Sequence, residues 1–148
     1  MKTLPMQAPI YLGFASQKGG VGKSSLAEIL ASILYYEKHL PLVVVDCDGT
    51  QESFYKLRER ERNLIQASKE LSEQLKVHFT KFGHPAYPIL RSTPDTALKD
   101  LQKYLESSER KERLVIFDFP GHAGTEALLQ LSIEMDYIIS PIEADPQS

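Results

Sequence analysis

The sequence predicts an α/β fold in which helices cover both faces of a mostly parallel β-sheet. Strands that are buried on both faces read as unbroken apolar runs, and Leu42–Asp46 and Leu114–Phe119 are two such runs, apart from one aspartate in each. Segments with apolar residues at helical spacing separate the runs, and this alternation is typical of parallel sheets. A glycine-rich loop follows the first strand, as it does in many folds of this class.

Length and composition indicate one globular domain. We expect residues 1–9 to form an N-terminal extension and residues 10–148 to form the domain, since 148 residues are the usual length of one domain. The net charge of −3 does not indicate a nucleic-acid or membrane surface. The single cysteine, Cys47, excludes an intramolecular disulfide framework, and no apolar run approaches the roughly 20 residues of a membrane span. We therefore expect a cytoplasmic protein.

The first strand and the first helix enclose the most informative segment of the chain. The strand is expected over Ile10–Ala15 and the helix from Ser24 to about Lys38, and Gln17–Ser25 between them reads Q-K-G-G-V-G-K-S-S. Several N–H groups must converge on a bound phosphate, and only backbone without Cβ atoms can wrap it that closely. The loop therefore predicts a phosphate site at the helix N-terminus. The alternative is a glycine-rich turn that carries a lysine by chance, which the two flanking elements disfavour.

The residue types in this loop indicate a nucleotide with a metal ion. Lys23 is expected to reach the β- and γ-phosphates, and the Ser24 hydroxyl is placed to bind Mg²⁺. The predicted nucleotide-binding residues are Lys18, Gly19, Gly20, Val21, Gly22, Lys23, Ser24 and Ser25.

The middle of the chain is less clearly patterned. After the Leu42–Asp46 strand, residues 51–74 form a long charged segment with apolar residues roughly on one face. Its run Arg58–Arg62, R-E-R-E-R, is typical of a solvated face; a DNA-contacting patch is the alternative, which the interleaved glutamates disfavour. Leu75–Thr80 and Tyr87–Ser92 are candidate short strands.

The last third of the chain predicts two helices and two strands. One helix is expected to begin with Thr93 as its cap and Pro94 as its first residue. The strand Leu114–Phe119 follows, then a short helix over Thr125–Leu131 and a last strand over Tyr137–Ser140.

Aspartates follow two of the predicted strands. Asp46 and Asp48 end one strand, and Asp118 ends another. Because right-handed crossovers bring the carboxyl ends of parallel strands to one edge, we expect all three near the glycine-rich loop. Carboxylates beside a triphosphate bind the waters of Mg²⁺ or orient the attacking water. The alternative for Asp46 and Asp48 is ordinary turn chemistry, because aspartate followed by glycine is common in turns.

The loop also differs from the plain phosphate-loop pattern. Gln17 stands where that pattern has its first glycine, and Lys18 precedes the glycine pair. The sequence K-G-G-V-G-K-S resembles the deviant Walker A motif of the ParA/MinD family of ATPases, in the SIMIBI class of P-loop proteins, and Ser16-Gln17 looks closer to its partitioning, Soj-like branch. The resemblance extends from about Ile10 to Pro141.

The resemblance implies a SIMIBI-type P-loop fold with ATP and Mg²⁺ as cofactors. It implies a nucleotide-dependent homodimer in which Lys18 reaches the phosphates held by the partner copy; the alternative is a solvated loop lysine. Asp118 resembles the Walker B aspartate, which holds a metal-bound water. By the same resemblance Asp48 would position the lytic water and Asp46 would support the metal. The expected catalytic residues are thus Lys18, Lys23 and Asp48, and the expected metal-site residues are Ser24, Asp46 and Asp118.

Two loops depart from the family. Gly49-Thr50-Gln51 stands where the family usually has Pro-Gln, in a loop that by the resemblance helps to form the dimer face and the water site and so bears on the rate of hydrolysis. Phe119–His122 stands where the family often has Thr-Pro-Pro, and with Asp118 it resembles the D-x-P-G-H of translational GTPases. His122 is then either a water-orienting residue or a surface loop histidine, and the second interpretation is preferred because such loops are commonly exposed.

The function implied is a slow ATPase that acts as a dimerisation switch. It would serve in the partitioning or transfer of DNA, whether plasmid, chromosome or conjugative element, and a partner protein would stimulate hydrolysis. The alternatives are a GTPase-like switch and a noncatalytic nucleotide-binding fragment. Because family members usually continue past this length, we expect the C-terminal part of the fold to be missing, together with the surface that holds nonspecific DNA.

Overall fold

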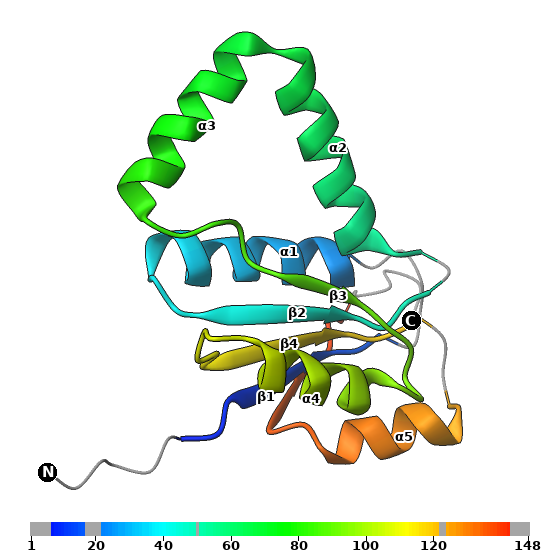
Figure 1. Ribbon diagram of the computed structural model, residues 1–148. Coiled ribbons are helices and arrows are strands. Elements are labelled where there is room, and N and C mark those ends of the chain that lie inside the picture. The colour runs from blue at the N-terminus through cyan, green and yellow to red at the C-terminus, as the bar shows by residue number, and fades with distance from the viewer. Residues whose placement is uncertain (1–6, 17–21, 50, 122–123, 143–148) are drawn as a thin grey trace, which may run out of the picture.

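In the part of the chain that the structure describes, five parallel strands form one sheet in the order β3-β2-β4-β1-β5 (Figure 1). The computed structural model describes residues 7–16, 22–49, 51–121 and 124–142. The strands are β1 (Ile10–Phe14), β2 (Leu42–Asp46), β3 (Ile89–Arg91), β4 (Leu114–Asp118) and β5 (Tyr137–Ile139). The helices are α1 (Lys23–Ser32), which continues as the π-helical turn η1 (Ile33–Glu37), then α2 (Ser53–Ala67), α3 (Lys69–Phe82), α4 (Ala97–Ser107) and α5 (Glu126–Ile133). The α/β fold expected from the sequence is confirmed.

The register of the sheet aligns the ends of its three central strands. β4 lies between β1 and β2, and Asp118 at its end is level with Phe14 on one side and Asp46 on the other. The backbone continues this alignment past the strands, since the N–H of Cys47 donates to the carbonyl of Asp118 over 3.0 Å. Two of the predicted aspartates are therefore neighbours at the carboxyl edge of the sheet.

Alternating residues of the central strands build a separate core on each face. Leu42, Val44, Leu114 and Ile116 face the side covered by α1, where Ala27, Ala31 and Tyr35 pack against them. Val43, Val45, Val115 and Phe117 face the opposite side and pack with residues of α4 and α5, among them Ala97, Leu101 and Leu131. Figure 1 shows α1 above the sheet, with α4 and α5 below it. Because both faces are covered, these strands have no polar alternation in their sequence.

The charged middle segment forms two helices rather than one helix and a strand. The prediction of a strand over Leu75–Thr80 is wrong, because these residues lie inside α3. The helical conformation is interrupted at Ser68, whose backbone is extended at φ −126°. The Ser68 hydroxyl caps α3, because it accepts the N–H of Leu71 over 3.3 Å. Apolar residues at 71, 75, 79 and 82 recur at the helical period, and this spacing was the better guide.

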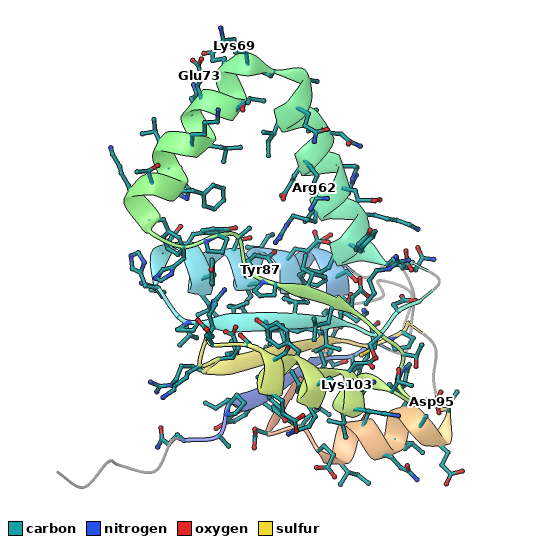
Figure 2. The ribbon with its side chains drawn as sticks, viewed as in Figure 1. Arg62, Lys69, Glu73, Tyr87, Asp95 and Lys103 are labelled. Atoms are coloured by element: carbon teal, nitrogen blue, oxygen red, sulfur yellow. The ribbon has the colours of Figure 1, made fainter. Side chains whose placement is uncertain are left out.

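Together α2 and α3 form a hairpin that stands away from the sheet (Figure 1). Lys69 and Glu73 lie at its tip, and α3 has no buried residue (Figure 2). At the base of the hairpin, an Arg58 guanidinium N–H donates to the Tyr87 carbonyl over 2.9 Å, and the Tyr35 hydroxyl donates to the Pro85 carbonyl over 2.6 Å. The hairpin is thus attached to the core mainly at its two ends.

The helix expected from Thr93 begins later. α4 starts at Ala97, and residues 94–96 form a turn in which the N–H of Thr96 donates to the Thr93 carbonyl over 3.2 Å. The predicted role of Thr93 as cap and Pro94 as first helical residue is therefore wrong. Proline fixes its own φ in a range that turns and helices share, so its presence alone did not separate the two.

The remaining elements agree with the sequence to within one or two residues. The short helix α5 begins after Thr125, whose hydroxyl accepts the N–H of Leu128 over 3.3 Å. The candidate strand Tyr87–Ser92 contains β3, which pairs with β2 at one edge of the sheet. Within the described part of the chain, no helix is long and apolar enough to cross a membrane.

Candidate functional site

The candidate site lies at the carboxyl edge of the sheet, where β1, β2 and β4 end beside the start of α1. Gly22 caps that helix with φ 80° and ψ 16°, and its carbonyl accepts the N–H of Leu26 over 2.9 Å. A residue with a Cβ is strained at this φ, so glycine is required for the backbone to turn into the helix. Residues 18–21, predicted to hold phosphates or to act across the dimer, lie outside the described residues.

Lys23, Ser24 and Asp118 form one connected polar group. The Lys23 ammonium pairs with Oδ1 of Asp118, and the Ser24 hydroxyl donates to Oδ2 of the same carboxylate over 2.9 Å. The ammonium also lies 3.3 Å from the Ser24 oxygen. Lys23 is 7% exposed and Asp118 is fully buried, so this is an ion pair removed from water. The structure thus brings Asp118 to the neighbouring residues Lys23 and Ser24, from which it is far removed in the sequence.

Asp46 organises the start of the loop that follows β2. Its Oδ1 accepts the N–H of Asp48 and its Oδ2 accepts the N–H of Phe54, each over 3.2 Å. The second bond reaches the first turn of α2. A carboxylate with both oxygens on backbone N–H groups ties the loop to the sheet. The described contacts of Asp46 are therefore those of a loop-ordering residue, and its expected metal role stays a prediction.

Asp48 is buried at the same edge of the sheet. Its Oδ1 accepts the N–H of Gln51 over 3.3 Å, and its carbonyl accepts the N–H of Glu52 over 2.7 Å. Burial raises the pKa of Asp118 most, and the charge of Asp48 adds to this shift in the same direction. The predicted grouping of Asp46, Asp48 and Asp118 is seen in the structure.

Burial and the charges of neighbouring carboxylates raise the pKa values of two aspartates in this site. Burial raises the pKa of Asp118, while the ammonium of Lys23 acts in the opposite direction. Burial, followed by the charge of Asp118, raises the pKa of Asp46 to about 6. Asp46, Asp48 and Asp118 are thus buried acidic side chains at one edge of the sheet, and a bound cation would stabilise their charged forms.

The donor set fits Mg²⁺ that is bound together with phosphate rather than in an all-protein cage. Among the described residues, no three His, Cys, Asp or Glu side chains are arranged to hold a metal ion. Mg²⁺ usually takes only one or two protein oxygens and completes its shell with waters and phosphate oxygens. Ser24 and Asp118 can supply a hydroxyl and a carboxylate for such a shell.

Glu28 is a site residue that was not predicted. It lies one helical turn after Ser24, and together with Ser24 and Ser25 it lines a polar cavity of about 590 Å³ between α1 and α2. Burial, and after it the charge of Asp118, raises the pKa of Glu28 to about 7. The i, i+4 spacing from Ser24 was the available indication, since it places both side chains on one face of the helix.

Cys47 and the loop after β4 add no described catalytic group. Cys47 is buried, and burial raises the pKa of its thiol well above the usual range, which agrees with a packing role. Phe119 is also buried, and its N–H donates to the carbonyl of Phe14 over 3.0 Å. His122 lies outside the described residues, so neither interpretation of it is tested.

Comparison with known proteins identifies the family to which this chain belongs. A family model described as the ATPase MipZ matches residues 10–145, which is most of the chain. The chain belongs to the MipZ family of ATPases. The expected relationship to ParA/MinD-type ATPases is thereby confirmed. No curated protein matches the sequence.

Solved structures of plasmid partition proteins share the fold. A plasmid partition protein from Borrelia burgdorferi superimposes with a TM-score of 0.55 at 21% identity, over 95% of this chain and 69% of that one. A putative plasmid partition protein from Borrelia burgdorferi B31, solved with AMPPNP, gives a TM-score of 0.52 at 22% identity, over 91% of this chain and 63% of that one. This chain therefore spans about two thirds of the length of these structures.

Proposed function

We propose that this chain binds ATP with Mg²⁺ at the carboxyl edge of the sheet and hydrolyses it slowly, as a switch for the association of two copies. The observation that carries the proposal is the buried pair of Lys23 and Asp118, joined by the Ser24 hydroxyl, at the start of the helix after a glycine-rich loop. An ammonium, a hydroxyl and a carboxylate at a helix N-terminus are the groups that a triphosphate and its metal require. Membership of a family of ATPases supports the same conclusion.

Each residue has a role that follows from its position. Lys23 would leave its contact with Asp118 and neutralise the β- and γ-phosphates, while Ser24 and Asp118 would bind the metal or its waters. Mg²⁺, when bound, offsets the charge that develops on the phosphate oxygens during transfer. Asp46 would support the metal and order the loop after β2, and Asp48 would orient the attacking water.

The switch would be completed by a second copy. Lys18 precedes the glycine pair and would supply a cation to the nucleotide of the partner, as an arginine finger does in other phosphoryl-transfer proteins. Adjacent Gly19, Gly20 and Val21 would contribute backbone N–H groups to the phosphates. We infer that a partner protein accelerates hydrolysis and thereby ends the associated state.

The cargo we propose is DNA that must be partitioned. The support is the likeness in fold to proteins whose printed names are plasmid partition proteins. The same ATP-dependent switch would also act on a chromosome or a conjugative element as its cargo. Contact with nonspecific DNA would require surface outside this length of chain, because net charge −3 gives no global attraction for phosphate backbones.

Calorimetric titration with ATP and Mg²⁺ tests the proposal. The unmodified chain should bind, and Lys23→Ala should abolish binding, because it removes the cation that faces the phosphates. Asp48→Ala should bind ATP normally and lose phosphate release. Lys69→Ala, at the tip of the hairpin and far from the sheet edge, is the matched control and should behave as the unmodified chain (Figure 2). Absence of binding by the folded, unmodified chain would overturn the proposal.

The same titration decides between ATP and GTP. The likeness of the sequence Asp118–His122 to a GTPase loop is the reason to test GTP, although the base-reading sequence N-K-x-D does not occur in the chain. ATP should displace GTP in a competition experiment. A clear preference for GTP would favour the GTPase-like switch.

A further inference from the structure

The loop that carries Asp48 ends at a residue with an unusual backbone conformation. Glu52, directly before α2, has φ 46° and ψ 44°, in the left-handed region that residues with a Cβ rarely adopt. Its N–H donates to the Asp48 carbonyl over 2.7 Å, and its own carbonyl accepts the N–H of Lys56 over 2.9 Å. Glu52 therefore joins the Asp48 loop to the first turn of α2.

Arg91 holds this residue from the neighbouring strand. It is the last residue of β3 and is level with Asp46 in the sheet. Its Nε donates to Oε1 of Glu52 over 3.2 Å, and its Nη2 contacts the same oxygen. The guanidinium carbon also lies 4.2 Å from the centre of the Tyr55 ring in the first turn of α2. One side chain thus links the sheet edge, the end of the loop and the helix that follows.

We propose that Arg91 is a positioning residue for Asp48. It holds Glu52 in the left-handed conformation and so fixes the loop in which the Asp48 carboxylate accepts the Gln51 N–H. Left-handed backbone at a residue other than glycine persists only where its surroundings hold it, and such residues cluster at functional loops. This inference rests on the proposed function, because it acts through the water-orienting role given to Asp48.

The contact between Arg91 and Glu52 is more than an isolated ion pair on the surface. Arg91 is half exposed, and an isolated ion pair in such a position adds little to stability. The Arg91 guanidinium both pairs with Glu52 and stacks on the Tyr55 ring, and the two contacts together restrict its position. The backbone of β3 reaches β2 without this side chain, since the N–H of Ser92 donates to the Asp46 carbonyl over 2.9 Å. Loss of the Arg91 side chain should therefore loosen the loop and leave the sheet intact.

The test compares Arg91→Ala with Arg91→Lys and with a matched arginine. Arg91→Ala should lower kcat for ATP by about tenfold with an unchanged Kd for ATP, since misplacing a reacting group costs rate rather than binding. Arg91→Lys keeps the charge but loses the planar guanidinium and should recover part of the rate. Arg113→Ala, an exposed arginine at the opposite end of the sheet, should change neither value. A fall in kcat that Arg113→Ala reproduces would overturn the proposal.

A double variant and hydrogen exchange separate this inference from the proposed function. If Arg91 acts through Glu52, then Arg91→Ala with Glu52→Ala should have the kcat of the slower single variant, whereas independent effects would multiply. Amide exchange at residues 51–56 should be faster in Arg91→Ala whether or not the chain hydrolyses ATP. Unchanged exchange refutes the link itself, and faster exchange with unchanged kcat refutes the positioning role. If the unmodified chain releases no phosphate, the proposed function fails, and with it the role given to Arg91, even where exchange shows the link to exist.

Discussion

At the residue scale, the ionised carboxylates of the site destabilise the folded protein when no ligand is bound. Burial raises the pKa of Asp46, of Asp118 and of Glu28, so each of them binds its proton more tightly in the folded chain than in the unfolded chain. A raised carboxyl pKa means that the folded state binds more protons, and its stability falls as the pH rises through that range. Groups arranged in this way are typical of functional sites, where a ligand supplies the missing positive charge.

Glu28 allows this cost to be measured without removing a proposed ligand of the metal. Its pKa is about 7 when folded against an ordinary value of 4.5, so the stability of the folded state falls as the pH rises between these two values. The loss is small near pH 5 and complete above the folded pKa. Glu28→Gln should raise the free energy of unfolding at pH 8 by about 1 kcal/mol, a value reduced for its partial exposure. It should change little at pH 5. Denaturant titrations at the two pH values give the comparison.

The control for Glu28 is a glutamate of the hairpin tip. Glu73→Gln should leave the free energy of unfolding unchanged at both pH values, because Glu73 is exposed and far from the site (Figure 2). An equal effect of Glu28→Gln at pH 5 and pH 8 would mean that packing of the side chain, rather than its charge, is responsible.

At the element scale, the helices differ in how they are held. α5 places Leu131 in the core below the sheet, whereas α3 has no buried residue and stands away from it. Both begin with a hydroxyl cap, from Thr125 and from Ser68. Removing an N-cap costs about 1 kcal/mol of helix stability in either helix. The global free energy of unfolding falls by this amount only where the helix unfolds together with the core.

The two caps therefore make a matched pair of variants. Thr125→Ala should lower the global free energy of unfolding by about 1 kcal/mol, because α5 unfolds with the core. Ser68→Ala should leave the global value nearly unchanged and accelerate amide exchange in the first turn of α3. Chemical denaturation with hydrogen exchange on both variants distinguishes the outcomes. An equal global loss in both would show that the hairpin unfolds together with the sheet.

The element scale also shows where sequence patterns were sufficient. Strands β2 and β4 were predicted within a residue because burial on both faces leaves an unbroken apolar run. The segment Leu75–Thr80 was misassigned because a short window of mixed residues fits two periods, and only the longer spacing from Leu71 to Phe82 identifies the helix. The start of α4 was placed too early because a turn and a first helical turn accept the same residues, Thr93 and Pro94 among them.

At the scale of the whole molecule, the proposed function predicts association that depends on nucleotide. With ATP and Mg²⁺, Asp48→Ala should retain its nucleotide and reach twice the monomer mass in light scattering. Lys18→Ala in the same background should stay at the monomer mass, because the cation that joins the two nucleotide sites is removed. Both should be monomeric without nucleotide.

Mass measurements bear on the switch separately from catalysis. A mass that stays at the monomer value while ATP is bound would contradict association through the nucleotide and leave binding intact. A mass that doubles without nucleotide would place the interface elsewhere on the chain. The calorimetric titration of Lys23→Ala measures ATP binding alone, so together with the mass it separates a loss of binding from a loss of association.

The sequence by itself determined the parallel α/β sheet and the grouping of Lys23, Ser24 and Asp118 at one edge of it, and it predicts that the loop before α1 binds phosphate. These follow from local spacing and from the rule that parallel strands end at a common edge. The tertiary structure alone decided that α2 and α3 form a raised hairpin, that Asp46 is engaged by backbone N–H groups, and that Glu28 and Arg91 border the site. Local spacing could indicate the helices and the place of Glu28 beside Ser24, but the position of the hairpin and the contacts of Asp46 and Arg91 join separate elements, and no local period encodes such contacts.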